Sequence, residues 1–245
     1  MRWQHEVDPD WLRARHKYLT ATDIVKLWPA AKKWKRGDSM PPTFIGMWMD
    51  KHSNCDVNPV SFDAAARGHC MEPFAVLDAN VLKQKNFHHW DDVVIHNGSL
   101  GFSPDAMNIP QPLLPVDIDY TDPSIEAASE IMEVKCFAPY HHGQCVVSGP
   151  EKDQRIQIAM AFKVLPDLQR AYITYYCPGA YIDIHVSEFH RDDLAEEFGM
   201  IDRVVGIWNC LTDMLKDKES HRATYSEEQI NDIVMNPDVV WECDL

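Results

Sequence analysis

The stretch S-E-I-M-E-V-K-C-F, residues 129–137, places a glutamate and a lysine inside an otherwise apolar run. Its alternation is typical of a β-strand, in which every second residue shares one face. We therefore expect Ile131, Glu133 and Lys135 to point to one side of the strand. Met132, Val134 and Cys136 are expected to point the other way, into the core. Since a Glu-x-Lys pair is also common on solvated strand faces, it needs support from the rest of the chain.

The patterns before this strand predict helices and a hairpin. We expect two short helices within 8–28, a loop at 29–43, a helix at 61–82 that Pro73 kinks or breaks, a hairpin around Asn97-Gly98 and an exposed insertion at 108–128.

The patterns after the strand predict a helix at 151–165, a hairpin around Pro178-Gly179 and a long helix at 191–217. This order favours an α/β fold with a central mixed sheet flanked by helices. We expect residues 1–217 to form a single domain and residues 218–245 to form a polar C-terminal extension.

Composition excludes several classes of protein. The chain of 245 residues has no apolar run long enough to span a membrane, and its start has no apolar leader. Seven scattered cysteines indicate reduced thiols in the cytoplasm. A net charge of −15 opposes phosphate binding, yet binding depends on the local field. Basic residues gather at 13–17 and 32–37, where Trp34 is expected to pack or to stack on a base.

Asp105 gives the Glu-x-Lys pair its chemical context. It follows the predicted hairpin, and its carboxylate is expected to meet Glu133 across neighbouring strands. Two carboxylates at one point repel each other unless a cation lies between them, and oxygen ligands favour Mg²⁺. Lys135 could then orient or deprotonate a water, or stabilise charge on a phosphate. The three residues form a minimal set for metal-assisted phosphodiester hydrolysis.

Five motifs occur along the chain in a characteristic order. They are Trp11, Arg15 and TATD (20–23); Gly68, Glu72 and Ala75; SPDA (103–106); EVKC (133–136); and RIQIAM (155–160). This ordered set resembles the PD-(D/E)xK nuclease superfamily, and within it the phage lambda exonuclease family, also called the YqaJ-like viral recombinase family. The resemblance implies a restriction-endonuclease-like core.

The resemblance also implies an activity. It is that of a Mg²⁺-dependent 5′-to-3′ exonuclease on linear double-stranded DNA, with Mn²⁺ as an alternative ion, which leaves 3′ overhangs for phage-type recombination by strand annealing. Carried over by position, the metal ligands would be Asp105, Glu133 and the carbonyl of Val134, and Lys135 would activate the water.

Further site residues follow from the same resemblance. Glu72 and Gln157 would assist catalysis, and Arg15, Thr22 and Ser103 would bind the 5′-phosphate of the DNA end.

The expected partners are DNA ends, further copies in a ring-shaped trimer and a single-strand annealing protein, with no membrane. The setting would be the cytoplasm of a bacterial host, with a phage-encoded gene. Three departures stand out: Ala106 replaces a glycine, Arg155 occupies the first glutamine position, and the insertion at 108–128 is longer than usual, with acids that should repel DNA unless they face away. The adjacent histidines at 88–89 and 141–142 show no ligand spacing that would mark a metal site.

Alternative functions are an endonuclease or repair nuclease on the same fold, or a catalytically silent DNA-binding module.

Overall fold

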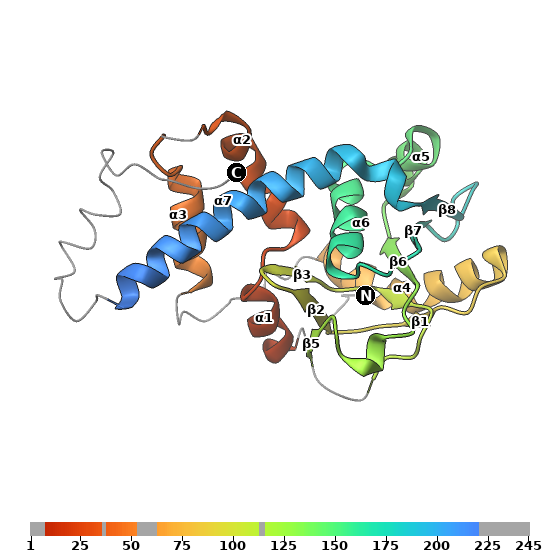
Figure 1. Ribbon diagram of the computed structural model, residues 1–245. Helices are drawn as coiled ribbons and strands as arrows, with labels where there is room; N and C mark the ends of the chain where they lie inside the picture. Colours follow the sequence, from red (N-terminus) through yellow and green to blue (C-terminus); the bar gives the residue numbers. More distant parts are fainter. Residues whose placement is uncertain (1–7, 36–37, 53–62, 113–115, 221–245) are drawn as a thin grey trace. The chain divides into compact units, whose positions relative to one another are not determined.

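The computed structural model describes residues 8–35, 38–52, 63–112 and 116–220 (Figure 1). Within these ranges the chain forms two compact units. The first unit takes in residues up to Thr22 and from Asp56 to Phe198, and the second takes in Asp23–Cys55 and the residues from Gly199 onward. The predicted C-terminal extension lies almost wholly outside the described residues.

A five-stranded mixed sheet forms the centre of the first unit. Its order is β1 (His88–His89), β4 (Ala106–Met107), β6 (Glu130–Lys135), β7 (Arg170–Tyr176) and β8 (Ile184–Phe189). Strands β6 and β7 are parallel, and the other neighbours are antiparallel. The predicted α/β class with a central mixed sheet is therefore confirmed.

Strand β6 is buried on both faces, which corrects the expectation of one core-facing side. Ile131 and Met132 are both inaccessible, and Glu133 retains 7% of its surface. The reason is its central place in the sheet, since covered strands read as apolar throughout rather than alternating. Glu133 is thus buried by the fold and does not lie on a solvated face.

Helix α4 (Asp63–Lys83) packs on the five-stranded sheet through small residues. Ala75, Val76 and Ala79 contact a cluster that includes Met132 and Val134 of β6. The helix runs through Pro73 without a break, although proline removes one backbone hydrogen bond. Burial of the small side chains just after Pro73 offsets that loss.

A three-stranded sheet holds the chain that leads into Asp105. Its order is β3 (Leu100–Phe102), β2 (Val94–Asn97) and β5 (Asp117–Asp119). The predicted hairpin is confirmed, but its two-residue loop is Gly98-Ser99, with Gly98 at φ 58°. Segment 108–128 is more than an exposed insertion, because it supplies β5 and the short helix η1 (Pro123–Ile125), and buries Ile118 and Ile125.

The predicted helices of the first unit are present, and α5 (Pro139–Ser148) is a further helix that the sequence patterns did not predict. Helix α1 (Pro9–His16) precedes Leu19, which bridges to Leu100 of β3. Helices α5 and α6 (Lys152–Val164) follow β6, and α6 contacts β2, β3 and β7. The short helix η2 (Arg191–Leu194) leads into the long helix α7 (Ala195–Ser220).

The second unit corrects the expected loop at 29–43. Helix α2 (Ala21–Lys33) continues through Pro29, and α3 (Pro42–Lys51) begins at a proline that suits a first helical position. Lys51, 6% exposed at its side chain, pairs with Asp23 at 2.9 Å. Trp34 is buried and its indole donates to the carbonyl of Ser39, so the packing interpretation is confirmed.

Two further features of the described residues are the state of their cysteines and the hydropathy of their helices. Cys70, Cys136, Cys145 and Cys177 are free thiols, as expected for a reducing compartment. Across the described ranges, no helix combines the length and apolarity that crossing a bilayer requires.

The contact between Gly101 and Tyr18 gives a test of the fold. A Cβ at position 101 would lie 2.6 Å from the Cβ of Tyr18, which cannot swing away. We expect Gly101→Ala to lower the free energy of unfolding by about 1–3 kcal/mol, the usual cost of overpacking. Gly143→Ala is the control, because no atom lies within 4 Å of its added methyl group and alanine favours helix. Urea denaturation measures both, and equal stability of the two variants would contradict the close approach.

Candidate active site

Asp105 is fixed beside the central strand by a backbone hydrogen bond. Its Oδ2 accepts from the N–H of Val134 at 2.6 Å, and its own carbonyl accepts from the N–H of Trp90 at 2.9 Å. Strand β4 is only two residues long and pairs with β6 no further than Met132. The carboxylate of Asp105 therefore accepts the backbone N–H that a longer β4 would have paired with one of its own carbonyl groups.

Val134 contributes a second backbone group at this point. In a strand, the N–H and C=O of one residue point to the same neighbour. Because the N–H of Val134 points to Asp105, its carbonyl oxygen points to the same open edge. Val134 therefore presents the oxygen that the predicted metal-ligand set requires.

Glu133 and Lys135 form a buried ion pair next to Asp105. The Nζ of Lys135 donates to Oε1 of Glu133 at 2.6 Å, with both side chains less than one fifth exposed. Burial would lower the pKa of Lys135, but the charges of Glu133 and Asp105 outweigh burial and raise it. Lys135 is therefore an ammonium group in the metal-free protein.

The crowding of charged groups changes the pKa of Asp105. Removal from water, followed by the charges of Glu133 and Glu72, raises the pKa of Asp105 well above its usual range. Lys135 and the N–H of Val134 oppose the rise without cancelling it. Three carboxylates thus meet one ammonium, and an oxygen-lined site with excess negative charge fits a hard divalent cation.

Glu72 reaches the same place from α4. It lies one helical turn before Ala75 and Val76, the residues that pack on the sheet. Its Oε2 lies 3.4 Å from Nδ1 of His69 and 3.8 Å from Nε2 of His89. Burial would raise the pKa of Glu72, but the two imidazoles outweigh burial and lower it to about 2. Glu72 is therefore ionised at neutral pH.

The two histidines around Glu72, His69 and His89, are not among the predicted site residues. His69 lies three residues before Glu72, a spacing that brings two side chains together on a helix and was available as a signal. His89 comes from the edge strand β1, so only the fold brings it to Glu72.

The two glutamine positions on α6 differ in surroundings. Gln157 has a buried Oε1 without a hydrogen-bond partner in the described part of the chain. Arg155 donates to Glu197 at 2.6 Å and to the carbonyl of Asp193, so its guanidinium is held by η2 and α7. The departure at Arg155 thus serves packing of the C-terminal elements, and Gln157 retains an unused polar atom.

Ala106 causes no backbone strain. Among the described residues other than glycine, positive φ occurs at Gln84 and Asp92. Ala106 instead pairs with Met132 in an ordinary β-ladder and is fully buried. The methyl group fits the core beneath α4, and the departure from glycine is tolerated.

Two of the residues predicted to bind a phosphate, Arg15 and Ser103, lie on either side of Trp11 at the end of β3. The guanidinium of Arg15 lies 5.1 Å from the centre of the Trp11 ring, and the Trp11 indole donates to Oγ of Ser103 at 3.2 Å. Backbone bonds from Leu19 to Ser99 and from Gly101 to Leu19 hold the segment between α1 and α2 against this hairpin. Thr22 is exposed in the first turn of α2, where backbone N–H groups lack helical partners.

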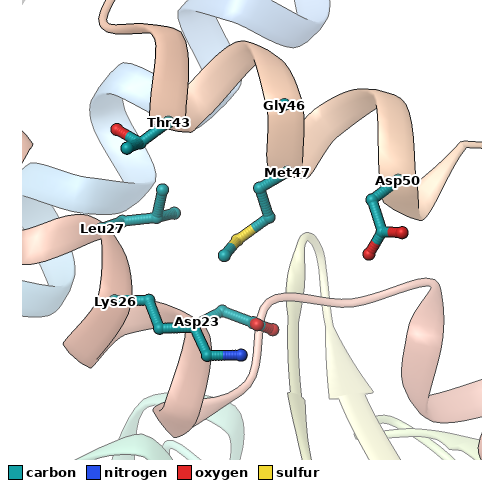
Figure 2. Close-up of a pocket in the computed structure, with 7 residues that line it drawn as sticks. All are labelled: Asp23, Lys26, Leu27, Thr43, Gly46, Met47 and Asp50. Atoms are coloured by element: carbon teal, nitrogen blue, oxygen red, sulfur yellow. The ribbon is translucent and has the colours of Figure 1, made fainter.

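A separate pocket lies in the second unit and contains none of the predicted site residues. Figure 2 shows the side chain of Met47 on α3 extending toward α2, with Asp50 near one end. The volume is about 350 Å³, and the lining residues are Asp23, Lys26, Leu27, Thr43, Gly46, Met47 and Asp50.

Comparisons with known proteins agree with this fold. No protein-family model matches the sequence, and no curated protein sequence matches it. Among solved structures, the chain is similar to the alkaline exonuclease LHK-Exo of Laribacter hongkongensis, with 15% identity and a TM-score of 0.58 over 87% of this chain and 98% of that one.

Two further structures are similar. The same exonuclease in complex with dAMP gives 16% identity and a TM-score of 0.59 over 87% and 98% of the two chains. A phage-related exonuclease of Haemophilus somnus 129PT gives 13% identity and a TM-score of 0.43 over 89% and 97%. The chain has the fold of the alkaline exonuclease, which is the fold that the motif resemblance implied.

Because negative charge is crowded around Asp105, we expect that replacing its carboxylate by an amide stabilises the folded protein. We expect Asp105→Asn to raise the free energy of unfolding of the metal-free protein at pH 8, by an amount within the roughly 0.5–3 kcal/mol that single substitutions usually produce. An amide oxygen still accepts from Val134, and one repelling charge is lost. The folded state raises the pKa of Asp105, so protonation stabilises the wild type and the difference shrinks as the pH falls toward 4.

Urea denaturation with a chelator at both pH values measures this difference. Asp167→Asn, at an exposed position after α6, is the matched control. If Asp105→Asn were less stable than the wild type at pH 8, the carboxylate cluster would already be compensated, and the argument for a cation would fail.

Proposed function

We propose that this protein is a metal-dependent exonuclease that degrades one strand of linear double-stranded DNA from its 5′ end and leaves a 3′ single-stranded overhang. The observation that carries the proposal is the meeting of Asp105, Glu133 and Lys135, with Val134 donating to Asp105 at 2.6 Å. That set contains both the ligands for a divalent cation and a cation able to face a phosphate.

The donor set fits Mg²⁺, with Mn²⁺ as the alternative. Asp105, Glu133 and the carbonyl of Val134 would hold the ion. Bound there, it would neutralise charge on the scissile phosphate and lower the pKa of an attacking water. Glu72 stays ionised, so its carboxylate would be able to accept a hydrogen bond from a water in the site.

Lys135 would first serve as a donor to a phosphate oxygen. The carboxylates of Glu133 and Asp105 hold it protonated in the metal-free protein, so it begins as a source of positive charge. Hydrolysis adds the water oxygen to phosphorus and expels the 3′ oxygen of the released nucleotide, which takes up a proton. Gln157, with its unused buried oxygen, is a candidate to orient Lys135 or the water.

Recognition of the DNA end is proposed for the cluster at the end of β3. Arg15 offers a planar fork that pairs with two phosphate oxygens, and its position on Trp11 restricts its movement. Ser103 and the first turn of α2 at Thr22 would add donors. Ser103 lies two residues before Asp105, so the cluster that binds the end is close to the site of cleavage along the chain.

Comparison with solved exonucleases supports the proposal at the level of fold, and one of those structures contains dAMP, the unit of a DNA strand. The net charge of −15 opposes DNA binding over the surface as a whole, so binding would depend on the local field of a basic surface. A trimeric ring, a single-strand annealing partner and a role in phage-type recombination in a bacterial cytoplasm belong to the same proposal. They would place basic residues around the DNA and acidic residues outside.

Digestion of a long linear duplex labelled separately at its 5′ and 3′ ends tests the activity. We expect rapid loss of 5′ label with Mg²⁺, persistence of 3′ label, and no digestion with a chelator. Lys135→Ala should reduce the rate by at least roughly 100-fold, because positioned acid–base or charge groups contribute that much. Its binding to DNA ends, measured by fluorescence anisotropy, should persist.

Lys152→Ala is the matched control, because this exposed lysine pairs with Glu196 on the surface. Cleavage of circular duplex would favour the endonuclease alternative. End binding without any digestion would favour the silent module, and equal rates for the wild type and Lys135→Ala would reject the assignment of the site.

A 5′-phosphate preference tests the role of Arg15. We expect the wild type to digest 5′-phosphorylated ends about 10- to 100-fold faster than 5′-hydroxyl ends, from a charged hydrogen bond worth about 1.5–3 kcal/mol. Arg15→Ala should remove the difference. Arg13→Ala, on the same helix but exposed and paired with Asp10, should retain it. Identical preferences in the two variants would place phosphate recognition elsewhere.

A further inference from the structure

We propose a second metal site, selective for Zn²⁺, formed by His141, Cys145 and Glu151 at the junction of α5 and α6. One ligand atom from each of the three residues lies within 4.8 Å of the others. None of them belongs to the carboxylate cluster around Asp105.

The local fold brings these three side chains together. His141 and Cys145 lie four residues apart on α5, which places them on the same face of the helix. Gly149 ends α5 at a φ of 79° and reverses the chain, so that Glu151 returns beside the last turn. A side chain at position 149 would strain this turn, because that φ favours glycine.

The distances suit a small ion. Nε2 of His141 and Oε1 of Glu151 are 3.0 Å apart. In a tetrahedral zinc site with bonds of about 2.0–2.3 Å, two ligand atoms are separated by about 3.3–3.8 Å. Small rotations of the three side chains would reach that geometry, and the fourth position would be open to water.

The site has a buried floor and an accessible rim. Cys145 is 2% exposed, whereas the side chains of His141 and Glu151 are 38% and 56% exposed. An ion could therefore enter from solvent between the imidazole and the carboxylate and meet the sulfur beneath them. Burial raises the pKa of Cys145, so the thiol is protonated without metal, and coordination would release its proton.

Neighbouring groups orient each ligand. The ring of Phe137 stacks on His141 with centroids 4.0 Å apart. Glu151 caps α6: its carboxylate accepts a backbone hydrogen bond from the first turn, and the side-chain oxygen of Gln154 accepts from the N–H of Glu151. Gln154 also accepts from the hydroxyl of Tyr175 at 2.6 Å, below the site. Such outer contacts fix the ligands of real metal sites.

The donor types select the ion. A nitrogen, a sulfur and an oxygen suit Zn²⁺, whereas Mg²⁺ requires hard oxygen ligands and an octahedral shell. The proposed ion would join the end of α5 to the start of α6. Phe137 also connects the site to the end of β6, two residues beyond Lys135. Zn²⁺ bound there would stabilise the segment that follows the catalytic strand.

Metal titration of the full chain tests the proposal. Excess Mg²⁺ occupies hard-oxygen sites, a phosphine reductant keeps free thiols reduced, and Zn²⁺ affinity is measured by competition with a chromophoric chelator. Cd²⁺ replaces Zn²⁺ in a parallel titration, because a thiolate ligand gives an ultraviolet charge-transfer band. The variants are Cys145→Ser, His141→Ala and Glu151→Gln, the last of which keeps an oxygen that can cap α6.

Two cysteine variants serve as controls. Cys177→Ser removes a buried thiol that is not one of the three proposed ligands. Cys136→Ser removes the thiol near Glu72; burial and the Glu72 carboxylate raise the pKa of Cys136 to about 12. We expect one Zn²⁺ per chain with Mg²⁺ present, a loss of affinity of at least tenfold in Cys145→Ser and His141→Ala, and unchanged affinity in both controls. The Cd²⁺ band should disappear in Cys145→Ser alone.

Either of two results would overturn the proposal. One is the absence of Zn²⁺ binding by the wild type when Mg²⁺ is present. The other is wild-type affinity in His141→Ala, whose exposed side chain can be removed without loss of the fold. In both cases the trio would be a surface hydrogen bond above a buried thiol, with no role in binding metal.

Discussion

The hydrogen bond from the N–H of Val134 to the carboxylate of Asp105 determines the geometry of the candidate site. It exists because β4 begins only at Ala106 and leaves the edge of β6 unpaired beyond Met132. A longer β4 would satisfy that N–H with backbone and would direct Asp105 elsewhere. The same open edge exposes the carbonyl of Val134, so one shortened strand supplies both the anchor for a carboxylate and a further oxygen.

Charge compensation is the second constraint, and the three buried carboxylates of the candidate site do not receive it equally. Lys135 pairs with Glu133, and His69 and His89 surround Glu72, whereas Asp105 remains poorly compensated. Folding pays for this imbalance with packing of α4 on the sheet, where small alanine side chains allow close contact. An uncompensated buried carboxylate is common at functional sites, since selection for chemistry tolerates a local loss of stability.

The end of β6 connects the two candidate metal sites. Before it lie the hard oxygens of Asp105, Glu133 and Val134, and beyond it Phe137 stacks on His141 of the nitrogen–sulfur–oxygen trio. Their donor chemistries differ enough that Mg²⁺ and Zn²⁺ would each prefer one site. A single strand would then carry catalysis at one part and stabilisation by metal at its continuation.

The sequence by itself determined most of the local elements and indicated the residues of the candidate site. Alternation marked β6, the Gly-containing turns marked the hairpins, and the order of motifs indicated Asp105, Glu133 and Lys135, because these signals act over short distances. Tertiary structure decided what depends on neighbours distant in the chain. Packing buried both faces of β6, formed a strand at 117–119 and a helix at α3, and placed Ala106 in an unstrained ladder. It also brought His89 to Glu72, and Glu151 to His141 and Cys145. Periodicity shows which residues share a face, but only packing decides what covers that face.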